Sequence, residues 1–245
     1  MANLKAAGLF RANLKGANLA EAHLEESDLR GADFTEAMLI DAHMSRIADG
    51  NLRETCFRGA DLTRAYLQGI DLTTATLTDA NLSRASLMDA KLGEFRGANL
   101  YLAKLDKAHL DGADLRGGNL GRAELLLGDL RRANLTRADL RSASLRMADL
   151  TAANLSGADL GEANLAQANL SGADLSGADL AGTLFDRNAV HLSRGRVGGR
   201  STLPWPATAV VTILRVARHP SGAAVKLPRT GSGDGTPSRR DNRCW

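Results

Sequence analysis

SGADLSGADL, residues 171–180, contains the same five-residue unit twice, and each unit closes on a leucine. The period extends far upstream. From Leu100 to Leu180 every fifth residue is leucine, over 17 consecutive positions, and Ala or Gly stands two residues before each. Asn or Asp directly precedes 13 of these leucines, so the consensus is A-(N/D)-L-x-x. The stretch is therefore one part of an ordered repeat, although its composition resembles that of a flexible linker.

A period of five fits neither an α-helix nor a straight strand. Successive leucines would step about 140° around a helix and form no stripe. On a strand, an odd period would send alternate leucines to opposite faces. The conflict disappears if the chain bends once per unit, with the two variable residues at the corner and Gly favoured at the second of them. We therefore expect Ala and Leu to point inward, and Asn/Asp and the corner pair to point outward.

On these A-(N/D)-L-x-x units, residues 2–185 resemble the pentapeptide repeat protein family. The resemblance implies an all-β fold, a right-handed quadrilateral β-helix with four units in each coil. Roughly 37 units would make roughly nine coils, and a rise of about 4.8 Å per coil gives a rod roughly 45 Å long.

The repeat changes phase twice, after Met44 and after Leu92, and each change shifts the register by three residues. Each break is either a shortened side or a small bulging loop, and the loops would span Ser45–Gly50 and Gly93–Ala98. We favour the loops, because insertions at corners disturb a coil least.

The net charge of +3 is divided unevenly between the repeats and the tail. Residues 186–245 carry 11 Lys/Arg and 3 Asp/Glu, a balance of +8, which leaves −5 on the rest. We interpret residues 186–204 as an Arg/Gly-rich linker and residues 221–245 as a disordered basic tail. Residues 205–220 are either a short helix or a strand, which would cap the last coil or form a homodimer contact. The abrupt change in composition also fits an out-of-frame translation.

With four units in each coil, positions 20 apart would stack in columns on the surface. Asp139, Asp159 and Asp179 would form an acidic column, which either imitates a phosphate backbone or is a solvated ladder imposed by the repeat. We favour the ladder, because a basic band lies within little more than one coil. The band consists of Arg122, Arg131, Arg132, Arg137, Arg141 and Arg146.

Apolar residues at corner positions predict a partner site beside this band, because exposed apolar patches often mark interaction surfaces. Met147 lies four units beyond Leu127 and should stack on it. Scattered surface apolar residues, which are normal in proteins, are the alternative. The candidate partner-binding residues are Tyr101, Leu102, Leu126, Leu127, Met147, Arg131 and Arg132.

The sequence shows no catalytic, cofactor or metal constellation. His23 and His43 lie 20 apart, but no third ligand is evident, and we interpret them as two stacked surface imidazoles. No nucleophile–base pair, cysteine cluster or Gly-rich phosphate loop appears, so we expect no enzyme, no cofactor and no small-molecule substrate. There is no apolar run of about 18 residues and no signal peptide, so we expect no membrane partner. Two cysteines fit a reducing, cytoplasmic compartment.

The expected function is a non-catalytic scaffold for protein–protein interaction with an unidentified partner. The resemblance adds an alternative, because the best-understood family members resemble duplex DNA in shape and charge, bind DNA gyrase and protect it from quinolones. A DNA-mimic protein would suit a rod with projecting loops. A balance of only −5 and the basic band count against it.

Overall fold

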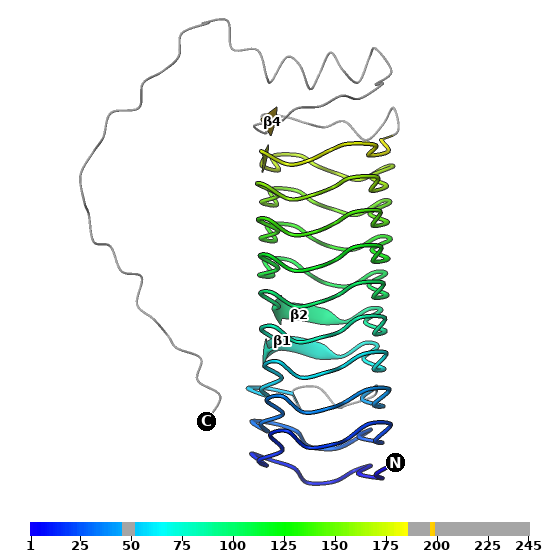
Figure 1. The fold of residues 1–245 in the computed structure, drawn as a ribbon, viewed down its shortest axis with the longest axis vertical. Coiled ribbons are helices and arrows are strands. Elements are labelled where there is room, and N and C mark those ends of the chain that lie inside the picture. The colour runs from blue at the N-terminus through cyan, green and yellow to red at the C-terminus, as the bar shows by residue number, and fades with distance from the viewer. Residues whose placement is uncertain (46–51, 186–196, 199–245) are drawn as a thin grey trace, which may run out of the picture.

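The computed structural model is a stack of similar coils that rises from the N-terminal end (Figure 1). It describes residues 1–45 and 52–185, and the backbone of 197–198. Residues 20 apart pair in parallel, from Asn3 with His23 to Asn164 with Leu184. Four units of five therefore complete one coil, as the quadrilateral β-helix implied by the family resemblance requires.

The regular strands are short, because most coils bend before a strand can extend. Strand β1 (Asp71–Thr76) pairs in parallel with β2 (Lys91–Glu94), and β3 (Leu175–Ser176) with β4 (Val197–Gly198). Isolated parallel bridges hold the remaining coils together. Within the part of the chain that the structure describes, no helix is long and apolar enough to cross a bilayer.

The repeat leucines and alanines fill the interior. Every repeat leucine from Leu100 to Leu170 is fully buried. A buried leucine contributes about 1.5–3 kcal/mol, so many identical units add up to a stable body despite the small number of aromatics. Phenylalanine replaces leucine at Phe34, Phe57 and Phe95, which are also buried, and the rings of Phe34 and Phe57 stack with centroids 5.1 Å apart.

Where Asn or Asp precedes the leucine, its side chain closes the corner. The side-chain Oδ1 of Asn119 accepts a hydrogen bond from the Gly121 N–H at 3.0 Å, and Asp179 accepts one from the Ala181 N–H at 2.9 Å. The second corner residue adopts the left-handed conformation, with φ between 53° and 70°, whether or not it is glycine. The Asn/Asp preference thus has a turn-forming role for the backbone, in addition to forming an outward ladder.

The first phase break lengthens a coil. Bridges across it join residues 23 apart, such as Met38 with Asp61 and His43 with Tyr66, which is three more than in a regular coil. The extra residues fall between Met44 and the next described repeat centre, Leu52, which is buried. A shortened side is therefore excluded here. Most of the expected Ser45–Gly50 loop lies outside the described residues.

At the second phase break, the prediction of a loop over Gly93–Ala98 is wrong. Bridges here join residues only 18 apart, such as Asn81 with Asn99. Strand β2 leads directly into Phe95, which is fully buried, and it pairs with β1 through an irregular register. Two residues are missing, so one corner is lost and two sides of the coil join in a straighter strand.

The tail is described only at β4, which lies inside the segment expected as a linker, 186–204. Its backbone pairs with β3, and so continues the parallel stacking beyond the last repeat. The expected capping element at 205–220, its dimer contact and the basic tail at 221–245 lie outside the described residues.

The shortened side predicts that Gly93 tolerates no side chain. A Cβ at Gly93 would lie 2.4 Å from the carbonyl oxygen of Thr73 in β1. We expect Gly93→Ala to lower the free energy of unfolding by about 1–3 kcal/mol, because the backbone must move to relieve the clash. Denaturant unfolding followed by circular dichroism measures this. Gly8→Ala is the control, since nothing lies within 4 Å of its Cβ. Equal stability of the two variants would contradict the close contact between β1 and β2.

Candidate interaction surface

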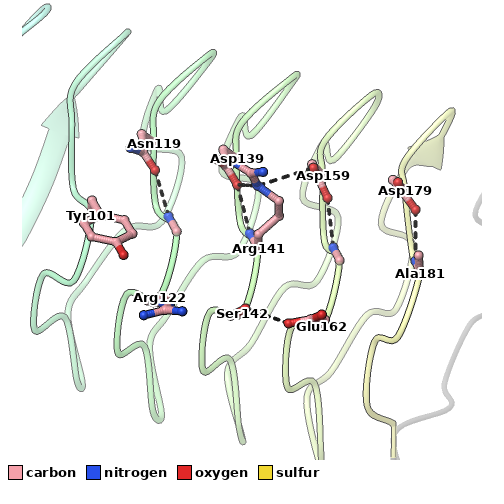
Figure 2. Close-up of a pocket in the computed structure, with 12 residues that line it drawn as sticks. Tyr101, Asn119, Arg122, Asp139, Arg141, Ser142, Asp159, Glu162, Asp179 and Ala181 are labelled. Atoms are coloured by element: carbon pink, nitrogen blue, oxygen red, sulfur yellow. Dashed lines mark hydrogen bonds and ion pairs between the residues drawn. The ribbon is translucent and has the colours of Figure 1, made fainter.

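A polar groove runs along one side of the stack (Figure 2). The first corner residues of this side differ in size: Tyr101, Gly121, Arg141, Gly161 and Ala181 stack one coil apart. The small residues form the hollow, and the tyrosine and arginine form its walls. A Cβ at Gly121 would lie 3.2 Å from the Tyr101 ring, so glycine lets the ring lie close to the next coil. We call this surface the Tyr101 groove.

The candidate acidic column lines this groove. Parallel bridges join Asp139 to Asp159 and Asp159 to Asp179, so the three side chains stack. Each carboxylate accepts a hydrogen bond from a backbone N–H of its own corner, at 3.0, 2.9 and 2.9 Å respectively. The column therefore has a role in forming the corners, whatever else it binds.

Arginine neutralises part of the column. Arg141 donates through Nη2 to Asp139 at 2.6 Å, and its Nε lies 3.6 Å from Asp159. The hydrogen bond from Arg141 holds the pKa of Asp139 below its ordinary value. Asp179 has no ion pair among the described residues. The groove remains acidic overall, because Arg122 and Arg141 face four carboxylates, those of the column and Glu162.

The groove continues past Tyr101 with the opposite charge. Tyr101 and Asn119 also line a second hollow, together with Thr63, Ser83 and two arginines. Of these arginines, Arg64 is paired with Asp41, with Nε to Oδ1 at 2.8 Å, whereas Arg84 is exposed and has no ion pair among the described residues. The continuous surface thus has a basic arm and an acidic arm, with an aromatic ring between them.

The predicted basic band does not form one patch. Its six arginines are distributed over all four corners of the coil, because they occupy units that face different sides. Arg131 and Arg132 lie on the side opposite the Tyr101 groove, where Arg131 binds Asp129 at 2.6 Å and Arg132 binds Asp111. These ion pairs lower the pKa values of both aspartates.

The candidate apolar residues occupy two neighbouring corners. Leu127 and Met147 stack and are 45% and 44% exposed, and Leu126 beside them is partly buried. Tyr101 and Leu102 lie on the preceding corner, at the Tyr101 groove. The side between these corners carries the exposed side chains of Lys104 and Glu124.

Sequence reasoning missed the basic arm. Arg64, Arg84, Leu102 and Arg122 occupy the same position of stacked units, but the coil between Arg84 and Leu102 is the shortened one. A strict spacing of four full units cannot bring them into one column. If the second phase break had been interpreted as a deletion of two residues, the spacing would have placed these four residues in one column.

The family model for pentapeptide repeats matches the chain in 8 copies, over residues 8–46, 55–93, 94–125, 128–157 and 148–187. The chain belongs to the pentapeptide repeat family. Proteins of this family form right-handed quadrilateral β-helices, which agrees with the coil observed here.

Three solved structures are similar to this pentapeptide repeat protein. HetL, involved in heterocyst differentiation regulation in the cyanobacterium Nostoc sp. Strain PCC 7120, is 35% identical, with 74% of this chain and 86% of HetL covered and a TM-score of 0.42. A pentapeptide repeat protein from the Arabidopsis thaliana thylakoid lumen is 31% identical, with 61% and 87% covered and a TM-score of 0.30. Trypsin-treated QnrB1, a plasmid-mediated fluoroquinolone resistance protein, is 20% identical, with 76% and 92% covered and a TM-score of 0.35. A search of curated proteins found no match.

The charge distribution of this pentapeptide repeat protein can be tested by carboxyl titration. We expect Arg141→Gln to raise the pKa of Asp139 toward its ordinary value of 3.8, because the variant loses the charged hydrogen bond. Since the pKa is lowered in the folded protein, the stabilisation is present above the ordinary pKa and is lost as the pH falls through the lowered one. NMR titration of the side-chain carboxyl carbons measures the pKa of Asp139 in the wild-type protein and in the variant.

Asp129 is the internal control, because its pKa is lowered by Arg131 at another corner. Its titration should be the same in the two proteins. An unchanged Asp139 pKa in the variant would show that the ion pair does not form in solution.

Proposed function

We propose that this pentapeptide repeat protein is a non-catalytic cytoplasmic scaffold that binds a protein partner along the Tyr101 groove. The observation that carries the proposal is the continuity of the groove past Tyr101, with a basic arm on one side and an acidic arm on the other. A polypeptide segment with opposite charges at its two ends would complement both arms.

The composition of the groove favours a macromolecule over a small molecule. The surface is open and polar, whereas small-molecule sites are mostly enclosed and apolar. Tyrosine is enriched among the residues that carry most of the energy of protein interfaces, and Tyr101 is central here. The charged arms would steer the encounter and fix the orientation of the bound segment.

The neighbouring apolar corner extends the proposed interface. Leu127 and Met147 hold left-handed conformations, with φ of 58° and 56°, so the turn fixes the position of each backbone beneath its side chain. A backbone that is already rigid loses little conformational entropy on binding, so only the side-chain rotamers remain to be ordered. Leu127→Glu should therefore weaken partner capture without unfolding the coil, since the side chain is already 45% exposed.

Site-specific crosslinking tests the proposed groove. We expect a photo-crosslinking amino acid in place of Tyr101 to capture a distinct protein in cells. The same amino acid in place of Thr151, which follows a leucine on the opposite side of the coil, should not capture it. Mass spectrometry of the crosslinked products identifies the captured proteins. The same capture from both positions would contradict a binding surface at the groove.

Charge reversal gives the matched comparison for the basic arm. Arg84→Glu should lower crosslinking from the Tyr101 position by roughly three- to tenfold, because it opposes the charge complementarity of that arm. Arg137→Glu is the control, since Arg137 is an exposed arginine with a similar φ, 56° against 60°, on another corner. An equal effect of the two reversals would indicate that only net charge matters.

The second candidate function is imitation of DNA toward gyrase, and the stacked column Asp139, Asp159 and Asp179 is the observation that favours it. Arg141 weakens the resemblance to a phosphate backbone, because it pairs with Asp139 and lies near Asp159. We place this candidate second for that reason.

A supercoiling assay decides the second candidate. If the chain is a DNA mimic, micromolar protein should inhibit gyrase or protect it from a quinolone, and Asp159→Asn should reduce the effect. We expect the wild-type protein neither to inhibit nor to protect, because the column is partly neutralised. Inhibition or protection that Asp159→Asn weakens would replace the scaffold proposal with the gyrase one.

A further inference from the structure

A second side of the stack, near the N-terminal end, places three metal-ligand side chains together. His23 and His43 come from neighbouring coils and are joined by a parallel bridge. Their rings stack with centroids 4.6 Å apart and an angle of 15° between planes. Glu25 lies two residues after His23, beyond the buried Leu24, so its carboxylate reaches the same outer face.

We propose that His23, Glu25 and His43 form a zinc-binding site. One ligand atom from each residue lies within 4.8 Å of the other two. Two imidazole nitrogens and one carboxylate are a donor set that Zn²⁺ prefers, and water would complete a tetrahedron. Calcium and magnesium are disfavoured, because they take oxygen ligands. The earlier interpretation of two surface imidazoles lacked the third ligand, which Glu25 supplies.

The unpaired oxygen of Glu25 is an independent observation that points to a cation. Oε1 accepts a hydrogen bond from His23 Nδ1 at 3.1 Å, but Oε2 is buried and has no hydrogen-bond partner among the described residues. A buried carboxylate oxygen without a donor costs free energy. Lys5, one coil before Glu25, does not satisfy it, because Lys5 pairs with Glu26 at 3.3 Å. A metal ion would supply the missing positive partner.

The distances require only a small rearrangement. Zinc–nitrogen bonds of about 2.0–2.1 Å in a tetrahedron place two nitrogens about 3.4 Å apart. The candidate ligand atoms lie within 4.8 Å of one another, so the stacked rings must rotate to bring the two imidazole nitrogens to this shorter separation. The ring of Tyr66 stacks on the far face of His43, with centroids also 4.6 Å apart. This contact covers one face of the His43 ring, and the ring nitrogens at its edge remain able to approach the ion.

Calorimetric titration of the full chain with ZnCl₂ tests the site. We expect one Zn²⁺ per chain at this site and a loss of affinity of at least about tenfold in His43→Gln and in Glu25→Gln, since each removes a ligand. His109→Gln is the matched control, because His109 also directly precedes a buried leucine but belongs to no such cluster among the described residues. His191→Gln with His219→Gln controls for the remaining histidines.

The absorption spectrum of the Co²⁺-loaded protein reports the ligands directly, and circular dichroism shows that each variant is folded. A d–d spectrum that changes in Glu25→Gln but not in His109→Gln supports the site. The proposal is overturned if wild-type protein does not bind Zn²⁺ at about 100 µM, or if binding is unaffected by both His43→Gln and Glu25→Gln. It is equally overturned if only the His191 and His219 substitutions abolish binding.

Discussion

Parallel pairing between residues one coil apart is the constraint on which the rest of this structure depends. It places each outward side chain about 4.8 Å from its equivalent in the next coil, so the surface consists of columns. The acidic column, the stacked histidines and the alternation of Tyr101, Gly121 and Arg141 all arise in this way. Recognition on such a surface is determined by which residues share a column, and neighbours in sequence matter much less.

The corners allow the columns to carry almost any side chain. Left-handed backbone is unfavourable for residues other than glycine, yet leucine, methionine, arginine and glutamate adopt it here. The pairing of adjacent coils offsets this cost, and wherever Asn or Asp precedes the leucine its hydrogen bond from the corner backbone adds to this stabilisation. A rigid position is therefore available at every corner, and Arg84 and Leu127 use it to present a charge and an apolar side chain.

The period of five predicted a chain that bends once per unit and the buried leucines, because these follow from spacing. The columns of the last 17 units also required the four units per coil that the family resemblance implies. The side of the coil on which each column lies could not be predicted across the phase breaks. An insertion of three and a deletion of two shift a five-residue repeat by the same amount. Only the pairing between coils distinguishes the lengthened coil from the shortened one. The ion pairs of Arg131 and Arg141, and the position of Glu25, depended on side-chain geometry that spacing does not contain.

The deletion after Leu92 determines which surfaces are joined. In the shortened coil, Tyr101 stacks above Ser83 and Leu102 above Arg84, so the acidic arm meets the basic one. With a loop at this position, the coil would contain five more residues than the shortened coil does, and the later coils would be rotated by one side. Tyr101 would then lie above Thr78 and Leu102 above Asp79, and the groove would lack its basic arm. The shortened side is thus the feature that gives an otherwise uniform rod a surface with two unlike ends.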